Sequence, residues 1–408
     1  MQGGTRSYEL ARRLVEKGHQ VDLITTDRVP RGTDDRQWKL TSEKGINVHW
    51  YPVPYSNNMG FFDRVRAFFS FARAATAKAG EMQADIVFAT STPLTIAIPG
   101  AVKSWRSKIP MVFEVRDLWP ELPIAIGALR NPVLKLAARL LERFAYRNSE
   151  AIVALSPGMR AGIVATGYDP DRVCIIPNAC DNAAFVVEPE KVEAFRKERD
   201  WLGDRPLLLY AGTLGEINGV GYLVEIAKQL EKLDSPTRIL IVGDGKEKEK
   251  ISKQAEDAGV LGKNLFMENS LPKSEMPVLF GAADISSSLF IDLPEMQANS
   301  ANKFFDTLAA GRPILINYGG WHSKIIEQSG AGLVTWQNSP DAVAREIDRH
   351  IQDEAWLEKA STASKKLSRE YFDRDQLAAD FESALLIASE RRGTAICKVN
   401  ELGDASAD

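Results

Sequence analysis

The chain of 408 residues has few cysteines, few histidines and no long hydrophobic run. Its three cysteines show no metal-ligand spacing, so we expect reduced thiols in a reducing compartment. Its four histidines are not paired at a ligand interval. No P-loop, G-x-S-x-G, H-E-x-x-H or zinc pattern occurs. The sequence therefore does not support a serine hydrolase, a P-loop nucleoside triphosphatase or a zinc-dependent enzyme.

The longest weakly polar run, residues 86–102, contains Pro93 and Pro99 and is short for a membrane-spanning helix. We interpret it as a buried strand, a loop and the start of a helix. No secretory signal is visible, so we expect a cytoplasmic protein.

The charge is unevenly distributed. The net charge is −4, but residues 1–187 hold 24 Lys and Arg against 18 Asp and Glu, a net of +6. Two predicted helices of this basic half, near 61–79 and 131–148, mix basic residues with apolar or aromatic ones. Such helices can dock on an anionic membrane surface, here the inner face of the plasma membrane. The alternative for the first helix is core packing with a solvated face. Nothing indicates a nucleic-acid partner.

Apolar strands alternate with helices along both halves, which predicts parallel sheets covered on both faces. We expect an α/β fold of two Rossmann-like, doubly wound domains facing across a cleft. The first strand of the N-terminal domain is missing from this prediction, because only Met1 and Gln2 precede its glycine turn. The predicted segments are domains at 1–185 and 186–370, a helix at 371–390 packing back toward the first domain, and a disordered tail at 391–408. Residues 28–44 are predicted to be a polar loop.

The stretch from Asn299 to Leu315 predicts one short helix. Asn299 or Ser300 is expected to cap it, and Gly311 suits the left-handed residue after its last turn. The helical period separates an apolar side from a polar side that carries Asn302, Lys303 and Asp306. A helix start with a cation binds anions, and a carboxylate one turn on accepts hydrogen bonds from sugar hydroxyls. These features predict a nucleoside diphosphate pocket; the alternative is an exposed Lys303–Asp306 ion pair.

A second candidate site is the loop that follows the predicted strand at 110–115. Its side chains include Arg116, Asp117, Trp119 and Glu121. Loops at the carboxyl ends of parallel strands line the ligand crevice. A carboxylate there can orient an acceptor hydroxyl, and Trp119 offers a flat surface for a sugar ring. The alternative is a structural ion pair of Arg116 with Asp117 or Glu121.

Several segments together resemble glycosyltransferase family 4, retaining enzymes of the GT-B fold. The segments are Gly3-Gly4-x-Arg6, VRDLWPE at 115–121, IVALSPGMR at 152–160, LLLYAGTLGEINGVGYL at 207–223, IVGDG at 241–245 and SANKFFDTLAAGRPIL at 300–315. The segment VRDLWPE is similar to the WbuB-like branch, which builds bacterial O-antigen, capsule and colanic-acid sugars. The resemblance implies a metal-independent hexosyltransferase without a cofactor, since the nucleotide sugar is a substrate.

The resemblance also implies roles for individual residues. In the C-terminal domain Lys303 and the amides at Ala301 and Asn302 would meet the donor diphosphate, Asp306 the ribose and Leu271 the base. Gly3 and Gly4 would face the diphosphate. Asp117 would act with Lys303 in catalysis, and the acceptor would be a lipid-linked glycan held by Arg116, Trp119 and Glu121. The expected donor is a UDP-sugar in preference to a GDP-sugar.

Two other hypotheses share this fold. One is a nucleotide-sugar 2-epimerase, and the other is a non-catalytic nucleotide-sugar-binding partner. Many family members place an Arg and a Lys after the first strand of the second domain, where this chain has Thr213 and Asn218. More of the anion's charge would therefore fall on Lys303.

Overall fold

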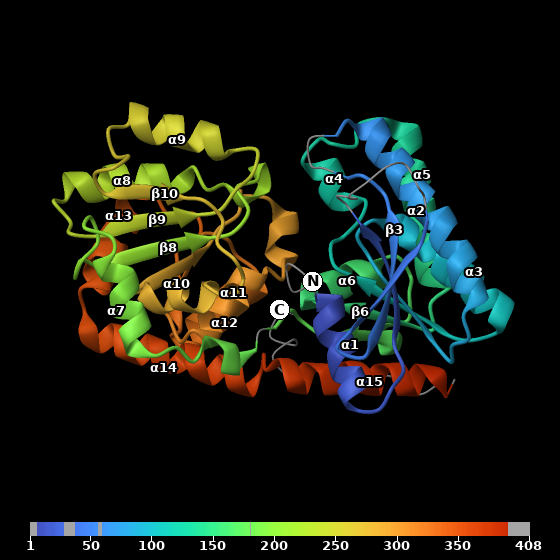
Figure 1. Ribbon diagram of the computed structural model, residues 1–408. Coiled ribbons are helices and arrows are strands. Elements are labelled where there is room, and N and C mark those ends of the chain that lie inside the picture. Colours follow the sequence, from blue (N-terminus) through green and yellow to red (C-terminus); the bar gives the residue numbers. More distant parts are fainter. Residues whose placement is uncertain (1–5, 28–36, 56–58, 180, 391–408) are drawn as a thin grey trace. The chain divides into compact units, whose positions relative to one another are not determined.

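The computed structural model describes residues 6–27, 37–55, 59–179 and 181–390. The chain divides into an N-terminal unit of residues 4–176 and 378–403 and a C-terminal unit that contains residues 177–377 (Figure 1). The first boundary thus falls before the expected residue 186. The second falls within the last helix, α15 (Arg374–Ser389), after the expected residue 371.

The C-terminal unit is built on a parallel sheet ordered β10-β9-β8-β11-β12-β13. Its strands are β8 (Leu207–Ala211), β9 (Arg238–Val242), β10 (Leu265–Glu268), β11 (Ile285–Ser288), β12 (Ile314–Ile316) and β13 (Gly332–Val334). Counted along the chain, this is the order 3-2-1-4-5-6 of dinucleotide-binding domains. The strand order reverses between β8 and β11, and such sheets bind ligands beyond the carboxyl ends of the strands at this point.

Helices cover both faces of this sheet, and strands such as β8 are therefore buried on both sides. They are α7 (Pro189–Lys197), α8 (Tyr222–Lys232), α9 (Lys248–Asp257), α10 (Met276–Ala282), α11 (Asn302–Ala309), α12 (Trp321–Ser329), α13 (Pro340–Ile351) and α14 (Glu354–Glu370). One apolar core joins the sheet to α8, α9 and α13, and another joins it to α10.

The N-terminal unit has its strands in two sheets. One is parallel and ordered β4-β5-β6-β7, and the other is ordered β1-β3-β2. The strands are β1 (Asp22–Asp27), β2 (Lys39–Glu43), β3 (Ile46–Pro52), β4 (Val87–Thr90), β5 (Met111–Val115), β6 (Ala151–Ala154) and β7 (Val173–Ile175). Within the described residues no strand joins β1 to β4.

Strand β2 corrects one prediction, because it lies in the expected polar loop. It pairs with β3 in antiparallel orientation, with Leu40 opposite His49. Leu40 is 63% exposed, so this edge strand shows no buried face in its sequence. Its pairing partner, and not its own residues, makes it a strand.

The helices of the N-terminal unit are α1 (Arg6–Glu16), α2 (Phe61–Glu81), α3 (Ala97–Ser107), α4 (Glu121–Ala125), α5 (Pro132–Arg147) and α6 (Pro157–Ala165). Short 3-10 helices are η1 (Leu94–Ile96), η2 (Pro170–Arg172), η3 (Asn182–Phe185), η4 (Glu216–Asn218) and η5 (Pro294–Ala298). The run at 86–102 is β4, η1 and the start of α3, as predicted. No helix in the described ranges combines the length and the hydropathy needed to cross a bilayer.

Helix α15 belongs to the C-terminal unit at its start and to the N-terminal unit from Ala378 on. In the latter, the Phe381 ring lies 4.7 Å from that of Phe88, and Glu382 Oε1 lies 2.7 Å from His19 Nε2. Cys174 is disulfide-bonded, so the expectation of reduced thiols is wrong for this residue. Cys180 and Cys397 lie outside the described residues.

Candidate functional site

The start of α11 has no side-chain cap. Its N-cap residue is Ala301, which has an extended backbone and no side-chain acceptor. Asn299 Oδ1 accepts a hydrogen bond from Ala301 N at 3.2 Å, and Ser300 Oγ accepts one from Asn178 N at 3.1 Å. The prediction that Asn299 or Ser300 caps the helix is therefore wrong. Gly311 takes a left-handed φ of 63°, as predicted. The first turn of α11 thus presents N–H groups that no described side chain satisfies, an arrangement that favours an anion.

Lys303 turns from α11 toward β8. Its Nζ donates a hydrogen bond to Tyr210 Oη at 3.1 Å. The same nitrogen lies 4.7 Å from the ring centroid of Tyr210 and 5.0 Å from that of Phe290. Burial alone lowers the pKa of this ammonium to about 7, and no described carboxylate opposes the shift. The alternative of an exposed Lys303–Asp306 ion pair is therefore wrong.

The loop after β8 brings Asn218 to the same ammonium. With its amide oriented to donate to Thr213 O at 2.9 Å, Asn218 offers its side-chain oxygen to Lys303 Nζ at 3.1 Å. This loop packs closely on the Gly-Asp-Gly turn after β9, where a Cβ on Gly243 would overlap the carbonyl oxygen of Gly212. The glycine turn therefore allows the two strand-end loops to touch, and this contact fixes the loop that carries Asn218.

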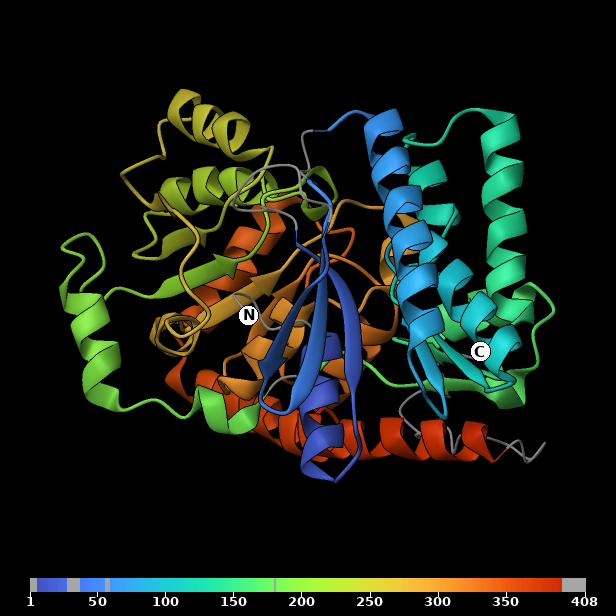
Figure 2. The same ribbon diagram turned by 45° about the vertical axis from the view of Figure 1, so that its right-hand side comes forward.

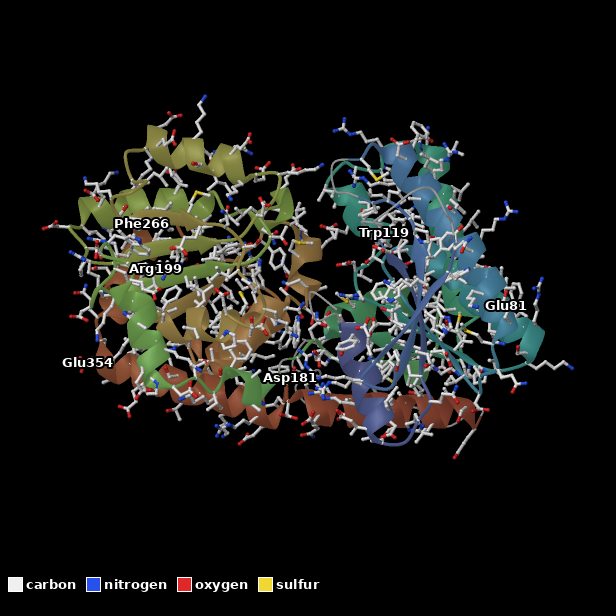
Figure 3. The ribbon with its side chains drawn as sticks, viewed as in Figure 1. Glu81, Trp119, Asp181, Arg199, Phe266 and Glu354 are labelled. Atoms are coloured by element: carbon white, nitrogen blue, oxygen red, sulfur yellow. The ribbon has the colours of Figure 1, made fainter. Side chains whose placement is uncertain are left out.

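Asp306 lies one turn further along α11 in a different environment. Burial raises the pKa of its carboxyl to about 7, while the charges of Arg374 and Lys273 lower it and that of Asp181 raises it. Arg374 Nε lies 3.4 Å from Asp181 Oδ1, so this arginine is partly neutralised (Figure 3 labels Asp181). Asp306 is thus a partly buried carboxylate whose charge the described residues only partly compensate.

The other predicted donor residues are placed as follows. Leu271 lies in the loop between β10 and α10 and packs against the apolar core beneath the sheet. Lys273 of the same loop acts on the pKa of Asp306, which puts this loop near α11. Ala301 and Asn302 form the uncapped start of α11, with Asn302 exposed. Gly3 and Gly4 lie outside the described residues.

The second candidate site lies in the N-terminal unit, at the carboxyl end of β5. Thr92 Oγ1 donates a hydrogen bond to Asp117 Oδ2 at 3.2 Å, and Arg116 N donates one to Ser91 Oγ at 3.0 Å. Burial raises the pKa of the Asp117 carboxyl, and the charge of Arg116 acts in the opposite direction. Among the described residues Arg116 forms no ion pair with Asp117 or Glu121, so that structural alternative is wrong.

Trp119 and Glu121 follow in the same loop. Trp119 is partly buried and lies beside α4, which begins at Glu121 (Figure 3). Glu121 acts on Glu142 of α5, whose pKa rises to about 7 through burial first and then through the charge of Glu121. Burial raises the pKa of Tyr146, and the charge of Glu142 raises it further. The buried Glu142 carboxyl thus interacts with Glu121 of this loop, and the sequence pattern of α5 did not reveal it.

Sequence reasoning missed the residues that surround Lys303. Tyr210 and Phe290 are both buried, and the sequence pattern indicated no role for either. Asn218 was considered only as a departure from the family pattern. The signal that these residues share is position, because each lies at the carboxyl end of β8 or β11 or in the loop that follows.

Within the described residues, no group of three or more His, Cys, Asp or Glu side chains is placed to hold a metal ion. The Asp169-Pro-Asp171 sequence forms a turn in which Asp169 Oδ1 accepts a hydrogen bond from Asp171 N at 3.0 Å.

Comparison with known proteins identifies the two units. The family model described as a glycosyl transferase 4-like domain matches residues 3–179, and that of glycosyl transferases group 1 matches residues 191–367. Over 74% of this chain and 76% of its relative, the sequence is 25% identical to WbjE of Pseudomonas aeruginosa, named as a glycosyltransferase. It is 24% identical to WcaI of Escherichia coli K12, named for colanic acid biosynthesis, over 64% of this chain and 67% of that protein.

Solved structures give the same fold. Anabaena HepE in complex with UDP and glucose superposes with a TM-score of 0.66 at 16% identity, over 84% of this chain and 87% of that chain. WaaG, a glycosyltransferase involved in lipopolysaccharide biosynthesis, superposes with a TM-score of 0.66 at 17% identity, over 92% and 94%. The resemblance read from the sequence motifs is confirmed: this chain belongs to the GT-B glycosyltransferases that join a glycosyl transferase 4-like domain to a group 1 domain, in the branch that includes O-antigen and colanic-acid enzymes.

Proposed function

We propose that this chain transfers a sugar, with retention of configuration, from a nucleotide-sugar donor to a lipid-linked or growing surface-polysaccharide acceptor. A UDP-sugar is favoured over a GDP-sugar. The observation that carries the proposal is the Lys303 ammonium, which has no described counterion and stands beside the uncapped first turn of α11. Both groups attract an anion, and the diphosphate is the anionic part of such a donor.

The proposed reaction needs stabilisation of a leaving diphosphate more than it needs a strong base. The acceptor hydroxyl oxygen bonds to the anomeric carbon on the face from which the diphosphate leaves. The bond from that carbon to the diphosphate oxygen breaks, its electron pair stays on the diphosphate, and the hydroxyl proton passes to a diphosphate oxygen. Lys303 and the dipole of α11 stabilise the negative charge that develops.

The remaining residues orient the two substrates. Asp306 is a carboxylate one turn from Lys303, and in the proposal it accepts hydrogen bonds from the ribose hydroxyls. Asp117, held by Thr92, orients the acceptor hydroxyl. Trp119 offers its ring to an acceptor sugar, and Arg116 and Glu121 are polar contacts for its hydroxyls.

The test is donor turnover by Lys303→Met against the matched control Lys366→Met. Lys366 lies in the same unit, and its side chain is 67% exposed. Loss of a charge-stabilising contact costs about 2–4 kcal/mol, so we expect Lys303→Met to reduce turnover by roughly 30- to 800-fold. Turnover within about threefold of wild type would show that Lys303 does not hold the diphosphate.

The same assay distinguishes the other two functions. A 2-epimerase would convert the nucleotide sugar to its epimer and release nucleotide without any acceptor. A binding partner would bind the nucleotide sugar and never turn it over, whichever lipid-linked acceptor is added.

A further inference from the structure

The chain that follows β12 contacts the surroundings of Lys303 at several points. Residues 317–322 read Asn-Tyr-Gly-Gly-Trp-His and lead from β12 into the first turn of α12. Helix α12 lies beside α11 in the C-terminal unit (Figures 1 and 2). The segment leaves the sheet at its carboxyl edge, where sheets of this kind bind ligands. Side chains at this place can shape a ligand site without touching the ligand.

Asn317 holds both backbone polar groups of Phe290. Asn317 Oδ1 accepts a hydrogen bond from Phe290 N at 2.9 Å, and Asn317 Nδ2 donates one to Phe290 O at 2.9 Å. The pairing of β11 with β12 ends at Ser288 and Ile316, so the side-chain amide continues it where the backbone ladder has stopped. One planar amide that both donates and accepts fixes the position and the tilt of the Phe290 backbone.

The ring of Phe290 lies beside the Lys303 ammonium. Phe290 is buried, and its ring centroid is 5.0 Å from Lys303 Nζ. At this distance an aromatic ring attracts a cation and also takes up space that water would fill. The groups that face the nitrogen from other elements, Tyr210, Asn218 and Phe290, carry no charge. Burial is the cause that lowers the pKa of Lys303, so whatever fixes Phe290 also maintains this burial.

Tyr318 supports the Phe290 ring edge-on. The two ring centroids are 5.2 Å apart, with an angle of 74° between the planes. Tyr318 is fixed in turn, because its Oη lies 3.1 Å from Nδ1 of the fully buried His322. The His322 ring stacks on Phe304, with 3.8 Å between the centroids. Phe304 is next to Lys303 in α11, so these contacts lead from Phe290 back to the helix that carries the lysine.

The same segment contacts the chain that enters α11. Trp321 Nε1 donates a hydrogen bond to Asn299 O at 2.7 Å, and Asn299 Oδ1 accepts one from Ala301 N at 3.2 Å. Gly320 has a left-handed φ of 98° and lies so close to η5 that a Cβ would overlap the carbonyl oxygen of Gln297. Glycine therefore allows the segment to approach the residues that lead into the uncapped helix start.

We propose that Asn317 is a positioning residue for the donor diphosphate, because its amide fixes Phe290 and the ring of Phe290 fixes the Lys303 ammonium. The inference rests on the proposed function, in which this ammonium meets the diphosphate. Lysine has a flexible four-carbon side chain, so an ammonium without the ring beside it has room for several positions. A misplacement of about 1 Å can cost on the order of 100-fold in rate. The competing account is that Asn317 only extends the pairing of β11 with β12 and stabilises the sheet.

The first test measures Lys303 in the absence of any donor. The whole chain is labelled with acetic anhydride between about pH 6 and pH 10, and mass spectrometry follows the peptide that contains Lys303. The pH of half-maximal labelling reports the pKa of this amine, and in the wild type it should lie well below the range of ordinary lysines. In Asn317→Ala and in Phe290→Leu this midpoint should move upward by at least about one pH unit, because the ring no longer keeps water from the ammonium. Asn317→Ser, whose hydroxyl can still donate to Phe290 O, should move it less.

Asn264→Ala is the matched control for a structural role. Asn264 comes just before β10, at the amino edge of the same sheet, and its Nδ2 donates a hydrogen bond to Ala227 O at 2.9 Å. Both Asn264→Ala and Asn317→Ala should lower stability in urea, but Asn264→Ala should leave the labelling midpoint of Lys303 unchanged. The proposal is wrong if Asn317→Ala leaves the midpoint unchanged, or if Asn264→Ala moves it equally. A wild-type midpoint in the range of ordinary lysines would also overturn it, even if the variants fail to fold.

The second test follows the release of UDP from UDP-glucose and separates this inference from the proposed function. Asn317→Ala should lower kcat by at least about tenfold, whereas Asn264→Ala should leave it unchanged. If the labelling midpoint moves as expected but Lys303→Met releases UDP like the wild type, the proposed function fails, and with it the role of Asn317 toward the diphosphate. If Lys303→Met loses turnover while Asn317→Ala keeps both kcat and the midpoint, the proposed function stands and Asn317 has only a structural role.

Discussion

Donor binding is expected to change the protonation of two residues in opposite directions. Burial lowers the pKa of Lys303 and raises the pKa of Asp306, in each case to about 7. The proposed function requires a charged ammonium beside the diphosphate and a charged carboxylate beside the ribose. A nucleotide sugar should therefore draw a proton onto Lys303 and expel a proton from Asp306.

The magnitudes follow from these two values. Each group is about half charged at pH 7 in the free protein, so binding exchanges about half a proton at each group and the two exchanges cancel. In Asp306→Asn only the proton uptake by Lys303 remains, about half a proton at pH 7 and close to one proton at pH 8. In Lys303→Met only the release remains, close to one proton at pH 6. The affinity of Asp306→Asn should fall about tenfold per pH unit above pH 7, because only the protonated ammonium binds well.

The assay is isothermal titration with UDP-glucose, whose diphosphate does not titrate near neutral pH, in the absence of acceptor. At each pH the measured enthalpy is plotted against the ionisation enthalpy of several buffers, and the slope gives the number of protons exchanged. Lys366→Met serves as the control and should behave like wild type, because its side chain is 67% exposed and its ion-pair partner, Glu370, belongs to its own helix.

One result would refute the reasoning. If Asp306→Asn binds the nucleotide sugar equally well at pH 6 and pH 8 and takes up no proton, Lys303 does not meet the diphosphate. Net exchange near zero in wild type alone proves little, since cancellation and absence of both effects look the same. The two variants separate these cases.

Three further predictions concern the supports of the site and of the fold. Tyr210→Phe keeps the ring but removes the oxygen that Lys303 contacts; a hydrogen bond to a charged group is worth about 1.5–3 kcal/mol, so initial rates should show a donor KM raised by at least about tenfold. Gly243→Ala should lower the free energy of unfolding in urea by about 2–4 kcal/mol, because its Cβ would overlap the Gly212 carbonyl, whereas Gly80→Ala meets nothing and should not destabilise. Arg6→Ala should lower the free energy of unfolding by about 3–5 kcal/mol in the same assay. Arg6 Nε lies 2.7 Å from Glu114 Oε1, and without it the fully buried carboxylate would lose its charged partner and keep the hydrogen bond from Thr90 Oγ1. A loss below about 1 kcal/mol would contradict this account.

Much of the fold was predictable because its strands are strongly patterned. The sequence predicts strands at 206–211 and 238–242 from their runs of five and four apolar residues. The structure has β8 at Leu207–Ala211 and β9 at Arg238–Val242. The two missed strands, β2 and β13, lie at sheet edges, with several residues exposed or only partly buried. An edge strand is defined by the neighbour to which it bonds, and a local pattern does not contain that information.

The candidate site was predictable in its backbone and not in its side-chain partners. The order of strands and helices places the start of α11 at the carboxyl edge of the sheet, and the sequence shows that order. The cap was mispredicted because Ser300 bonds to Asn178, which lies 122 positions away in the sequence. The partners of Lys303 are also distant, since Tyr210 is separated from it by 93 positions. Contacts of this length depend on tertiary packing.

The environment of Lys303 itself argues for an anionic ligand. A lysine on a surface helix usually pairs with a carboxylate or keeps its ammonium in water. Here the ammonium is surrounded by two aromatic rings, a phenol oxygen and an amide, and burial lowers its pKa to about 7. These neutral groups hold the side chain in place but compensate its charge only weakly, so charging it costs free energy in the empty protein. A bound diphosphate would supply the missing counter-charge, and part of its binding energy would be spent on restoring the proton. The rings therefore position Lys303 without supplying a counter-charge, which the ligand would provide.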